Sequence, residues 1–449
     1  MSFRWLFHYI EFIHNRIYYK NFFVEGKENI PQQSEAVVVA SCHQNAINDP
    51  LAIEFAFADH TVNLFARGGL FENKFLNYFF RSIHVIPAYR MRTDGEESLG
   101  KNFTEFDQVE EKLFNNEWVG IFPEATNQTR HYLGEFSLGY LRMAFQAAER
   151  QNFEKEVKIL PIAIHYDNYH RFRSNCLVRI APAVSLQPFY ELYKTKPRTA
   201  QRQVNALVRE SIRSVMLDIQ SEENYEAIDY IRNTYGVKYA AQRGLDPKYL
   251  SKKLDSDMQL CRTLVDHSAS EPEKMKELFA SALELKSKTY SAGIRDWVLR
   301  NNDSALWLIL YGITLLCLLP VFLYTLIPNI LIMLAPIPLC KKMDKIGGPF
   351  VMFKGGVQIV ISSLVTAPLL YIAVFVLEFI YLGWMTATLH FIMQPWLLIY
   401  AWTYYEYARK YLSLIRFKFG TLFARGKERA AGLRALRGSL WSKLDELCA

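Results

Sequence analysis

The sequence predicts an α/β fold with a mixed sheet covered by helices, followed by a helical extension and a C-terminal transmembrane helical region. Short apolar runs alternate with amphipathic stretches up to about residue 190, as in strands separated by helices. Charged helical patterns without strand signals follow, and long apolar runs begin near residue 304. A chain of 449 residues has room for two or three units of domain size.

Several segments of the alternating part have the composition of short, buried strands. They are residues 36–41, 84–89, 118–125, 158–166 and 177–186. Helical periodicity is found between them at residues 50–58, 102–115 and 137–151. Because the helical stretches separate strands, we expect the helices to cover the faces of one sheet.

Residues 3–20 are predicted to form an amphipathic helix. Apolar side chains recur at helical spacing and polar ones line the opposite stripe. The apolar residues are Leu6, Tyr9, Ile10, Ile13 and Ile17, and the polar ones are Arg4, His8, Glu11 and Asn15. Such a helix can lie in a membrane interface or pack on its own domain. The charged residues also argue against a cleavable signal peptide.

These patterns divide the chain into segments of different character. The predicted segments are an amphipathic helix at 1–24, an α/β domain at 25–190, a helical extension at 191–303, a transmembrane region at 304–403 and a basic amphipathic tail at 404–449. The helical extension contains no motif that indicates chemistry. Any active site is therefore expected in the α/β domain.

Residues 305–339 form an apolar run that is too long for an ordinary core helix, because a membrane span needs about 20 apolar residues. A second run covers 356–402, and the two runs have room for three or four spans. Basic residues lie between the runs and after the second one, so both chain ends are expected on the cytoplasmic side. The first run would fold back at Pro320 or enter without crossing, and the second would turn near Gly383.

Composition excludes several classes of protein. The net charge of +7 is modest, and no short motif interleaves basic and aromatic residues, so no nucleic-acid partner is expected. The six cysteines are scattered without CxxC spacing, which argues against a disulfide framework or a zinc site. Scattered single cysteines fit a reducing compartment.

The segment SCHQNAINDPLAIEFAF, residues 41–57, places a histidine and an aspartate between a strand and a helix. His43 could act as a general base, and Asp49 could fix its tautomer and stabilise the imidazolium. The alternative is structural, since Asp49 is a favoured N-cap and Pro50 suits the first helical position. Cys42 beside His43 is a poor candidate for a Cys/His pair, because neighbouring residues at a strand end point in opposite directions.

Three further blocks follow along the chain. HVIPAYRMR places Arg90 just past a strand, GIFPEATNQTR ends a strand in Phe-Pro-Glu-Ala-Thr, and ILPIAIHY carries Pro161. Together with the histidine–aspartate block, this series resembles the glycerophosphate and lysophosphatidate acyltransferases over about residues 25–190. The resemblance implies an acyltransferase-type α/β domain in that range.

The resemblance also implies a role for each matching residue. His43 would be the general base that activates an acceptor hydroxyl, and Asp49 would orient it. Arg90 would hold the phosphate of the acceptor. The further residues of the acceptor site would be Glu124, Thr126 and Arg67, which stands where the family places a basic residue.

The implied reaction moves a fatty acyl group from a thioester to a hydroxyl of a glycerol-phosphate type acceptor in glycerophospholipid synthesis. The donor would be acyl-CoA or acyl-carrier protein, and neither a metal nor a separate cofactor is implied. The lipid bilayer is the expected partner of an integral membrane protein whose catalytic domain faces the cytoplasm. The rival functions are an acyl thioesterase on the same fold and a non-catalytic lipid-binding scaffold at the membrane.

Two features depart from the family pattern. The common spacing has four residues between His and Asp, and in this chain Asn48 occupies that place while Asp49 is one residue further. Asp49 is the predicted orienting residue, and Asn48 stays an alternative because an amide can also orient a neutral imidazole. The third block has Ala125 in place of glycine and Asn127 in place of a basic residue, which bears on the identity of the acceptor.

Overall fold

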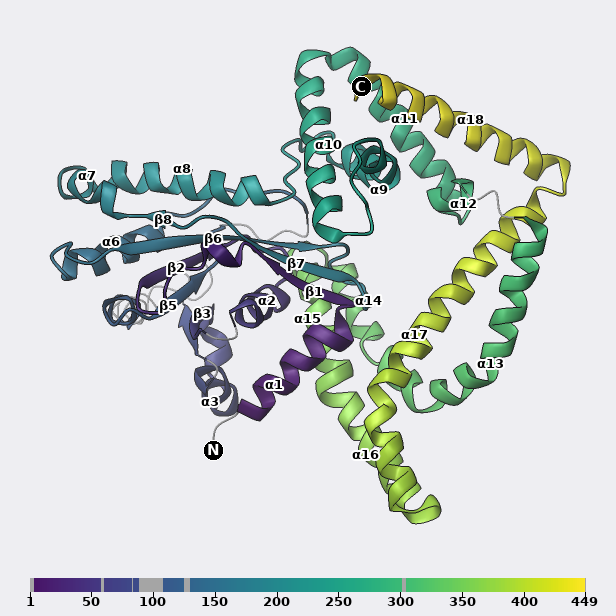
Figure 1. The fold of residues 1–449 in the computed structure, drawn as a ribbon, viewed down its shortest axis with the longest axis horizontal. Coiled ribbons are helices and arrows are strands. Elements are labelled where there is room, and N and C mark those ends of the chain that lie inside the picture. The colour runs from purple at the N-terminus through teal and green to yellow at the C-terminus, as the bar shows by residue number, and fades with distance from the viewer. Residues whose placement is uncertain are drawn as a thin grey trace. The chain divides into compact units, whose positions relative to one another are not determined.

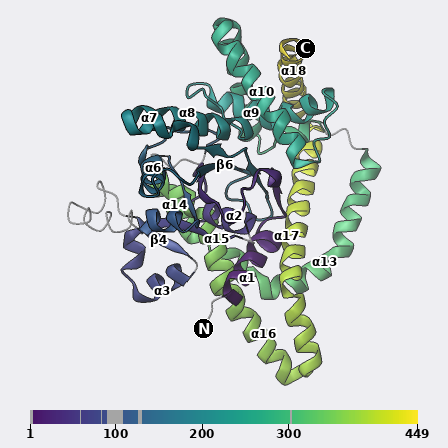
Figure 2. The same ribbon diagram turned by 60° about the vertical axis from the view of Figure 1, so that its left-hand side comes forward.

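The computed structural model describes residues 4–57, 60–82, 84–88, 108–124, 130–300 and 304–448. Contacts divide the chain into two compact units. The first unit is Met1–Leu217 with Leu339–Ile359, and the second is Asp218–Pro338 with Val360–Ala449. Figure 1 and Figure 2 show the helices and strands of both.

The first unit is built on one eight-stranded sheet in the order β1-β7-β6-β2-β5-β3-β4, with β8 paired to β6. The strands are β1 (Asn21–Glu25), β2 (Ala36–Ser41), β3 (Val62–Arg67), β4 (Val85–Ala88), β5 (Trp118–Ile121), β6 (Val157–Tyr166), β7 (Asn175–Ile180) and β8 (Val184–Ser185). The run from β6 to β4 is parallel, while β7 and β8 pair with β6 antiparallel. The predicted mixed sheet is therefore confirmed.

Parallel pairing brings the carboxyl ends of β2, β5, β3 and β4 to the same edge of the sheet. Ala40 near the end of β2 pairs with Ile121 at the end of β5, and Arg67 at the end of β3 pairs with Ala88 at the end of β4. Ligands of open α/β sheets bind outside this edge, because the loops that follow the strands meet there. Polar residues just past these strand ends are thus candidates for one site.

One face of the sheet is covered by α6 (Gly139–Arg150), α7 (Tyr190–Thr195) and α8 (Pro197–Val215), as Figure 1 shows. Val38, Ile159, Phe145 and Val204 belong to the buried core between these helices and the sheet. Every residue of β2 is buried. In a central strand that is covered on both faces, successive side chains are all buried, so the sequence is continuously apolar. This explains the valines of β2.

The opposite face carries α1 (Arg4–Phe12), a π-helix (Ile13–Tyr18) and α2 (Asn48–Ala56). The apolar stripe predicted for the N-terminal helix is buried at Ile10, Ile13 and Ile17. Phe7 packs edge-on against Phe55 of α2, with ring centroids 5.4 Å apart. This burial favours packing on its own domain over a position in the membrane interface.

The first unit also contains a segment from far downstream in the chain. It includes most of α14 (Ile337–Ile346), a 3₁₀ helix (Gly348–Phe353) and α15 (Lys354–Gln358). The side chain of Gln358 accepts a hydrogen bond from the Tyr18 hydroxyl at 2.8 Å. Contacts of this kind group Leu339–Ile359 with the sheet, although the segment follows a long apolar helix.

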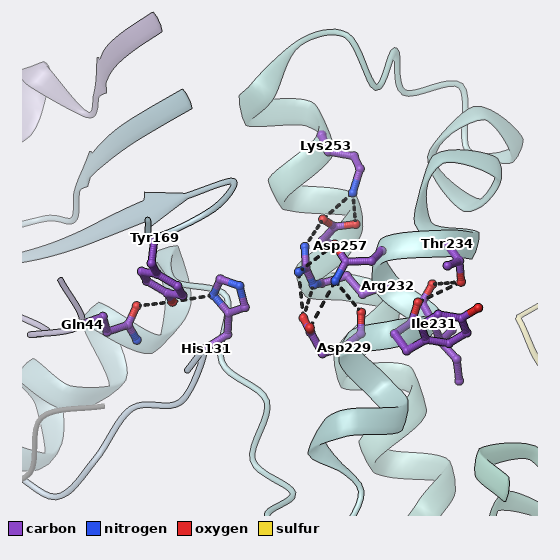
Figure 3. A network of polar contacts seen from close by, with 11 residues as sticks. Gln44, His131, Tyr169, Asp229, Ile231, Arg232, Thr234, Lys253 and Asp257 are labelled. Atoms are coloured by element: carbon purple, nitrogen blue, oxygen red, sulfur yellow. Dashed lines mark hydrogen bonds and ion pairs between the residues drawn. The ribbon is translucent and has the colours of Figure 1, made fainter. Parts of the chain in front are cut away.

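The second unit is helical in the part that the structure describes. Its helices are α9 (Tyr225–Gln242), α10 (Leu250–Ser270), α11 (Pro272–Ser291), α12 (Asp296–Arg300), α13 (Ala305–Leu334), most of a π-helix (Ile359–Thr366), α16 (Ala367–Leu382), α17 (Trp384–Gly420) and α18 (Ala424–Leu447). Between α9 and α10, the buried Arg232 forms ion pairs with Asp229 and Asp257, and Lys253 also contacts Asp257 (Figure 3). This cluster neutralises a guanidinium that burial would otherwise penalise.

Within the described chain, two helical stretches are long and apolar enough to cross a membrane, by length and composition alone: Ala305–Ile346 and Phe350–Leu382. Only 11% and 17% of their most apolar windows are buried, so the protein itself leaves most of this surface uncovered. Helix α13 continues through Pro320, whereas a hairpin at this residue was one expectation. The expected turn at Gly383 is present between α16 and α17, where φ is 87°.

The division into units differs from the predicted segments at residues 191–217 and at residues 339–359, which both belong to the first unit. Helix α8 packs against β6 and buries Val204 and Val208 in the core of the sheet, so the first unit continues to Leu217 rather than 190. The amphipathic pattern of this helix indicated an apolar face but not the surface that covers it. The boundaries expected at 24, 303 and 403 stay predictions.

Candidate active site

The loop after β2 carries the first candidate residues. β2 ends at Ser41 and α2 begins at Asn48, so the chain turns within six residues at the carboxyl edge of the sheet. Ala46 has a φ of 27°, outside the usual region for a residue with a side chain. This turn brings His43 and Asp49 face to face.

The His43 ring is held by neighbours on several sides. Its Nδ1 lies 3.0 Å from Asp49 Oδ2, and its ring stacks on Phe122 with centroids 4.4 Å apart. Its backbone N–H donates to Glu124 Oε2 at 2.8 Å. The side chain is still 18% exposed. With Nδ1 facing the aspartate, Nε2 is the nitrogen that an incoming group can reach.

Asp49 is fixed more firmly than the histidine that it faces. Its side chain is 1% exposed, and its Oδ2 accepts the backbone N–H groups of Gln44 and Asn45, both at 2.7 Å. The hydroxyl of Tyr166 donates to Oδ1 at 2.8 Å. Hydrogen bonds from several donors compensate a buried carboxylate and prevent its rotation.

The two residues proposed to orient His43 have different partners. Asp49 contacts the imidazole, whereas Asn48 is buried and donates from Nδ2 to the Tyr19 hydroxyl at 3.1 Å. The N-cap position of α2 is Ile47, so Asp49 lies inside the first helical turn instead of capping it. Geometry thus favours Asp49 over Asn48 as the orienting residue.

Glu124 connects the loop after β5 to the loop after β2. Its Oε1 accepts the backbone N–H of Gly134 at 3.0 Å, while Oε2 accepts that of His43. An isolated bridge pairs its backbone with Phe136. Both carboxylate oxygens bind main chain of the protein, which suits a residue that shapes the site by holding loops together.

The titration of Glu124 gives a testable pH dependence. Burial raises the pKa of Glu124 from an ordinary 4.5 to about 7. Between these values the folded protein binds a proton that the unfolded chain releases, so this group makes stability fall as the pH rises toward 7. Glutamine does not titrate. The melting temperature of wild type relative to Glu124→Gln should therefore decrease by on the order of 5 °C between about pH 5 and pH 7.5.

Thermal unfolding of both proteins in the same detergent, at several pH values, measures this difference. The melting temperature of wild type minus that of Glu124→Gln should fall with pH. A difference that stays constant or rises with pH would contradict the raised pKa.

Gln44 and Asn45 tie the same loop to the turn after β6. The Tyr169 hydroxyl donates to Gln44 Oε1 at 2.9 Å and lies 3.0 Å from His131 Nδ1, as Figure 3 shows. Asn45 Nδ2 donates to the Tyr169 carbonyl at 2.9 Å. Because the hydroxyl has one proton, His131 Nδ1 is the donor in the second contact. The loop is therefore held on the side of β6 as well as on the side of β5.

Cys42 lies in the apolar core instead of facing the site. It is a member of the buried cluster on the helix-covered face of the sheet, and burial raises the pKa of its thiol. A thiol that stays protonated is a weak nucleophile. This agrees with the expectation that Cys42 and His43 point in different directions.

A comparison with known families decides the class of this domain. A family model described as Acyltransferase matches residues 21–165, which include the strands β1 to β5 and the loop with His43 and Asp49. This part of the chain, about a third of its length, is therefore similar to the acyltransferase family. The resemblance predicted from the sequence blocks is confirmed at this level.

Curated relatives of this chain are longer proteins. The chain is 26% identical over 255 residues to an uncharacterized acyltransferase of Schizosaccharomyces pombe, covering 54% of this chain and 36% of the relative. It is 24% identical over 140 residues to glycerol-3-phosphate O-acyltransferase 1 of Saccharomyces cerevisiae, covering 30% and 18%. The matched regions thus span 36% and 18% of the length of these relatives.

Solved structures are also similar to part of this chain. One of them is the crystal structure of the 1-acyl-sn-glycerophosphate (LPA) acyltransferase PlsC from Thermotoga maritima, with 23% sequence identity and a TM-score of 0.31. The similarity covers 45% of this chain and 80% of that one.

The structure describes the remaining predicted site residues less fully. Arg67 is the last residue of β3, at the edge of the sheet where β2 and β5 also end. Arg90 and Thr126 lie outside the described residues. Their predicted roles in binding the acceptor stay predictions.

Sequence reasoning did not find two neighbours of the candidate pair. Tyr166 is the last residue of β6 and reaches Asp49 from far along the chain. Phe122 stacks on His43 and stands in the same block as Glu124. Phe122 could have been found, because it belongs to the Phe-Pro-Glu block. No local pattern distinguished Tyr166 from the other residues of its strand.

Proposed function

We propose that this acyltransferase moves a fatty acyl group from a thioester to a hydroxyl of a glycerol-phosphate type acceptor. The observation that carries the proposal is the His43–Asp49 pair, 3.0 Å apart, at the carboxyl edge of the sheet in a domain of the acyltransferase family. A histidine with one nitrogen on a buried carboxylate and the other accessible is suited to remove a proton from an alcohol.

The proposed chemistry needs no nucleophile from the protein. The acceptor hydroxyl donates to His43 Nε2, and its proton moves to that nitrogen as the oxygen attacks the thioester carbonyl carbon. Asp49 stabilises the imidazolium and keeps the ring from rotating. When the tetrahedral intermediate collapses, the carbon–sulfur bond breaks and the thiolate takes the proton from the imidazolium. The products are an ester and a thiol, and the histidine is neutral again.

Arg90 would bind a phosphate group on the acceptor. β4 ends at Ala88, two residues earlier in the sequence, at the sheet edge where the His43 loop lies. A guanidinium binds phosphate oxygens through two parallel hydrogen bonds, which an ammonium group cannot copy. Coenzyme A and acyl carrier protein are the two proposed carriers of the donor, and no separate cofactor takes part.

Product analysis tests the proposal directly. Purified full-length protein is given acyl-CoA or acyl-carrier protein with glycerol 3-phosphate, dihydroxyacetone phosphate, lysophosphatidate or a phosphate-free lipid alcohol. Mass spectrometry should find an acylated phosphate-bearing acceptor. Free fatty acid formed without any acceptor would indicate a thioesterase instead, and no turnover of any thioester would indicate a non-catalytic lipid-binding scaffold.

Arg90→Lys separates acceptor binding from chemistry. The acceptor KM is expected to rise by about tenfold or more, with kcat changed less, because the lost bidentate contact is made in the ground state as well. The donor KM serves as the internal control and should stay near the wild-type value. An equal loss with the phosphate-free acceptor would show that Arg90 does not read phosphate.

The substrates of such a reaction suggest a place at the membrane. The uncovered apolar surfaces of Ala305–Ile346 and Phe350–Leu382 support membrane association of the whole chain. The lysines after residue 340 favour a cytoplasmic position for the connection between the two apolar stretches. Acyl thioesters are available in that compartment. Whether an impermeant reagent labels a cysteine at residue 343 from outside intact cells decides this orientation.

A further inference from the structure

Helix α15 (Lys354–Gln358) lies against the loop of the candidate active site, although it is far downstream of it in the sequence. Contacts place it in the first unit with the sheet, whereas the family match ends at residue 165. It lies near the start of the second apolar stretch, Phe350–Leu382, and carries the sequence Lys-Gly-Gly-Val-Gln. Both glycines of this sequence are buried.

Gly355 approaches the loop and the turn after β6 so closely that an added side chain would have to displace a neighbouring group. A Cβ at this position would lie 2.6 Å from Asn48 Nδ2, 3.0 Å from Asn45 Oδ1 and 3.2 Å from the Tyr169 carbonyl oxygen. These distances are shorter than van der Waals contact. The glycine therefore allows α15 to pack on the loop and on the turn after β6 at once.

Gly356 approaches Ile47, a neighbouring residue of the same loop, in a similar way. A Cβ there would lie 2.7 Å from both Cβ and Cδ1 of Ile47 and 3.0 Å from its Cγ1. Ile47 is the N-cap residue of α2. Two successive glycines thus contact the loop from Asn45 to Asn48, directly between His43 and Asp49 in the sequence.

Hydrogen bonds and an ion pair fix α15 in this position. The Tyr18 hydroxyl donates to Gln358 Oε1 at 2.8 Å, at one end of the helix. Lys354 Nζ lies 2.8 Å from Asp344 Oδ1 at the other end. Tyr19, the neighbour of Tyr18, accepts the hydrogen bond from Asn48. The loop and α15 are therefore tied to the same stretch of chain.

We propose that Gly355 and Gly356 are positioning residues of the acyltransferase site, so that α15 forms the outer support of the loop from His43 to Asp49. The loop has support from Glu124 on one side and from Tyr169 on another. The glycine pair supplies the surface against which residues 45–48 close. Without it, the loop could move outward and carry Asp49 away from the imidazole.

The proposal extends the site beyond the matched domain. Residues 21–165 contain the proposed reacting pair, and α15 adds a support from the second apolar stretch of the chain. The proposal rests on the proposed acyl transfer for its kinetic part. Its structural part, the packing of α15 on the loop, can be measured without any activity.

The kinetic test uses Gly355→Ala and Gly356→Ala in the full-length protein, with Gly432→Ala as control. Gly432 lies in helix α18, and a Cβ there meets nothing within 4 Å. Small displacements of reacting groups cost up to about 10²-fold in rate, so kcat of the two variants should fall by about 10- to 100-fold. The KM of donor and acceptor should change little, and the control should keep the wild-type rate.

A compensating change distinguishes positioning from general damage. Ile47→Gly removes all three atoms that the new methyl group of Gly356→Ala would meet, and glycine is tolerated at an N-cap. The methyl group of Gly356→Ala should lower kcat much less in the Ile47→Gly background than in wild type, so the double variant should have a rate close to that of Ile47→Gly alone. An equal loss of kcat in both backgrounds, with both single variants folded, would overturn the proposal.

Hydrogen–deuterium exchange supplies the measurement that does not depend on turnover. In Gly355→Ala and Gly356→Ala, the amides of residues 43–49 should exchange faster than in wild type, while those of α9 and α11 should be unchanged. Unchanged exchange in the loop would overturn the proposal even if activity fell. Faster exchange in a protein whose wild type transfers no acyl group would instead contradict the proposed function and leave the packing intact.

Discussion

Replacing His43 with alanine is expected to lower kcat by about 10²- to 10⁴-fold, the usual contribution of a general base. The acceptor hydroxyl would have no other described group that faces Asp49 and can take its proton. The fold should survive, because the ring is partly exposed and packs mainly on Phe122. Initial rates with saturating thioester and acceptor, measured beside circular dichroism and melting temperature, give both quantities.

His60→Ala is a suitable control for this change. His60 follows the far end of α2, just before β3 begins, and its ring lies against Trp118 at the opposite edge of the sheet. The variant should lose some stability and keep its kcat within about a few-fold of wild type. Retention of more than a few per cent of the wild-type rate in His43→Ala would exclude His43 as the general base.

Asp49→Asn is expected to lower kcat by about 10²- to 10⁴-fold while changing the shape of the site very little. The amide oxygen can keep the bonds from Gln44 and Asn45, and the amide nitrogen can face Tyr166, whose hydroxyl can rotate to accept. The variant loses the negative charge that stabilises the imidazolium. Pre-steady-state or steady-state rates over a range of pH measure the loss.

Asn48→Ala is the matched comparison for the orienting role. Its expected effect is a loss of about 1–3 kcal/mol of stability, because the buried Tyr19 hydroxyl loses its donor, with a smaller effect on kcat. Should the Asn48 variant lose more kcat than Asp49→Asn, the orienting residue is Asn48. A similar small effect of both changes would mean that the imidazole needs no buried partner.

Much of the site could be predicted because its parts follow strand ends that are visible in the sequence. Val37, Val38 and Val39 mark a central strand, and the polar residues that follow must leave the sheet at its carboxyl edge. The same reasoning places Glu124 after β5. Strands and their exits have a local pattern of hydrophobicity, so they can be read without knowing the neighbours.

The spacing from His43 to Asp49 did not decide which acidic or amide residue faces the imidazole. The structure decides it through the turn at Ala46 and through the two backbone N–H groups that bind Asp49. Likewise, the amphipathic helix at 197–215 showed an apolar face, and only packing against β6 assigned it to the first unit.

By itself, the sequence determined the fold class, the family that the α/β domain resembles and the loop that carries the candidate histidine. Only the tertiary structure decided that Tyr166 fixes Asp49, that Glu124 binds the His43 main chain, and that Gly355 packs on the loop. The physical reason is sequence separation. Local hydrophobic pattern reports which face of an element is buried, whereas a contact between distant segments depends on how the whole chain folds back on itself.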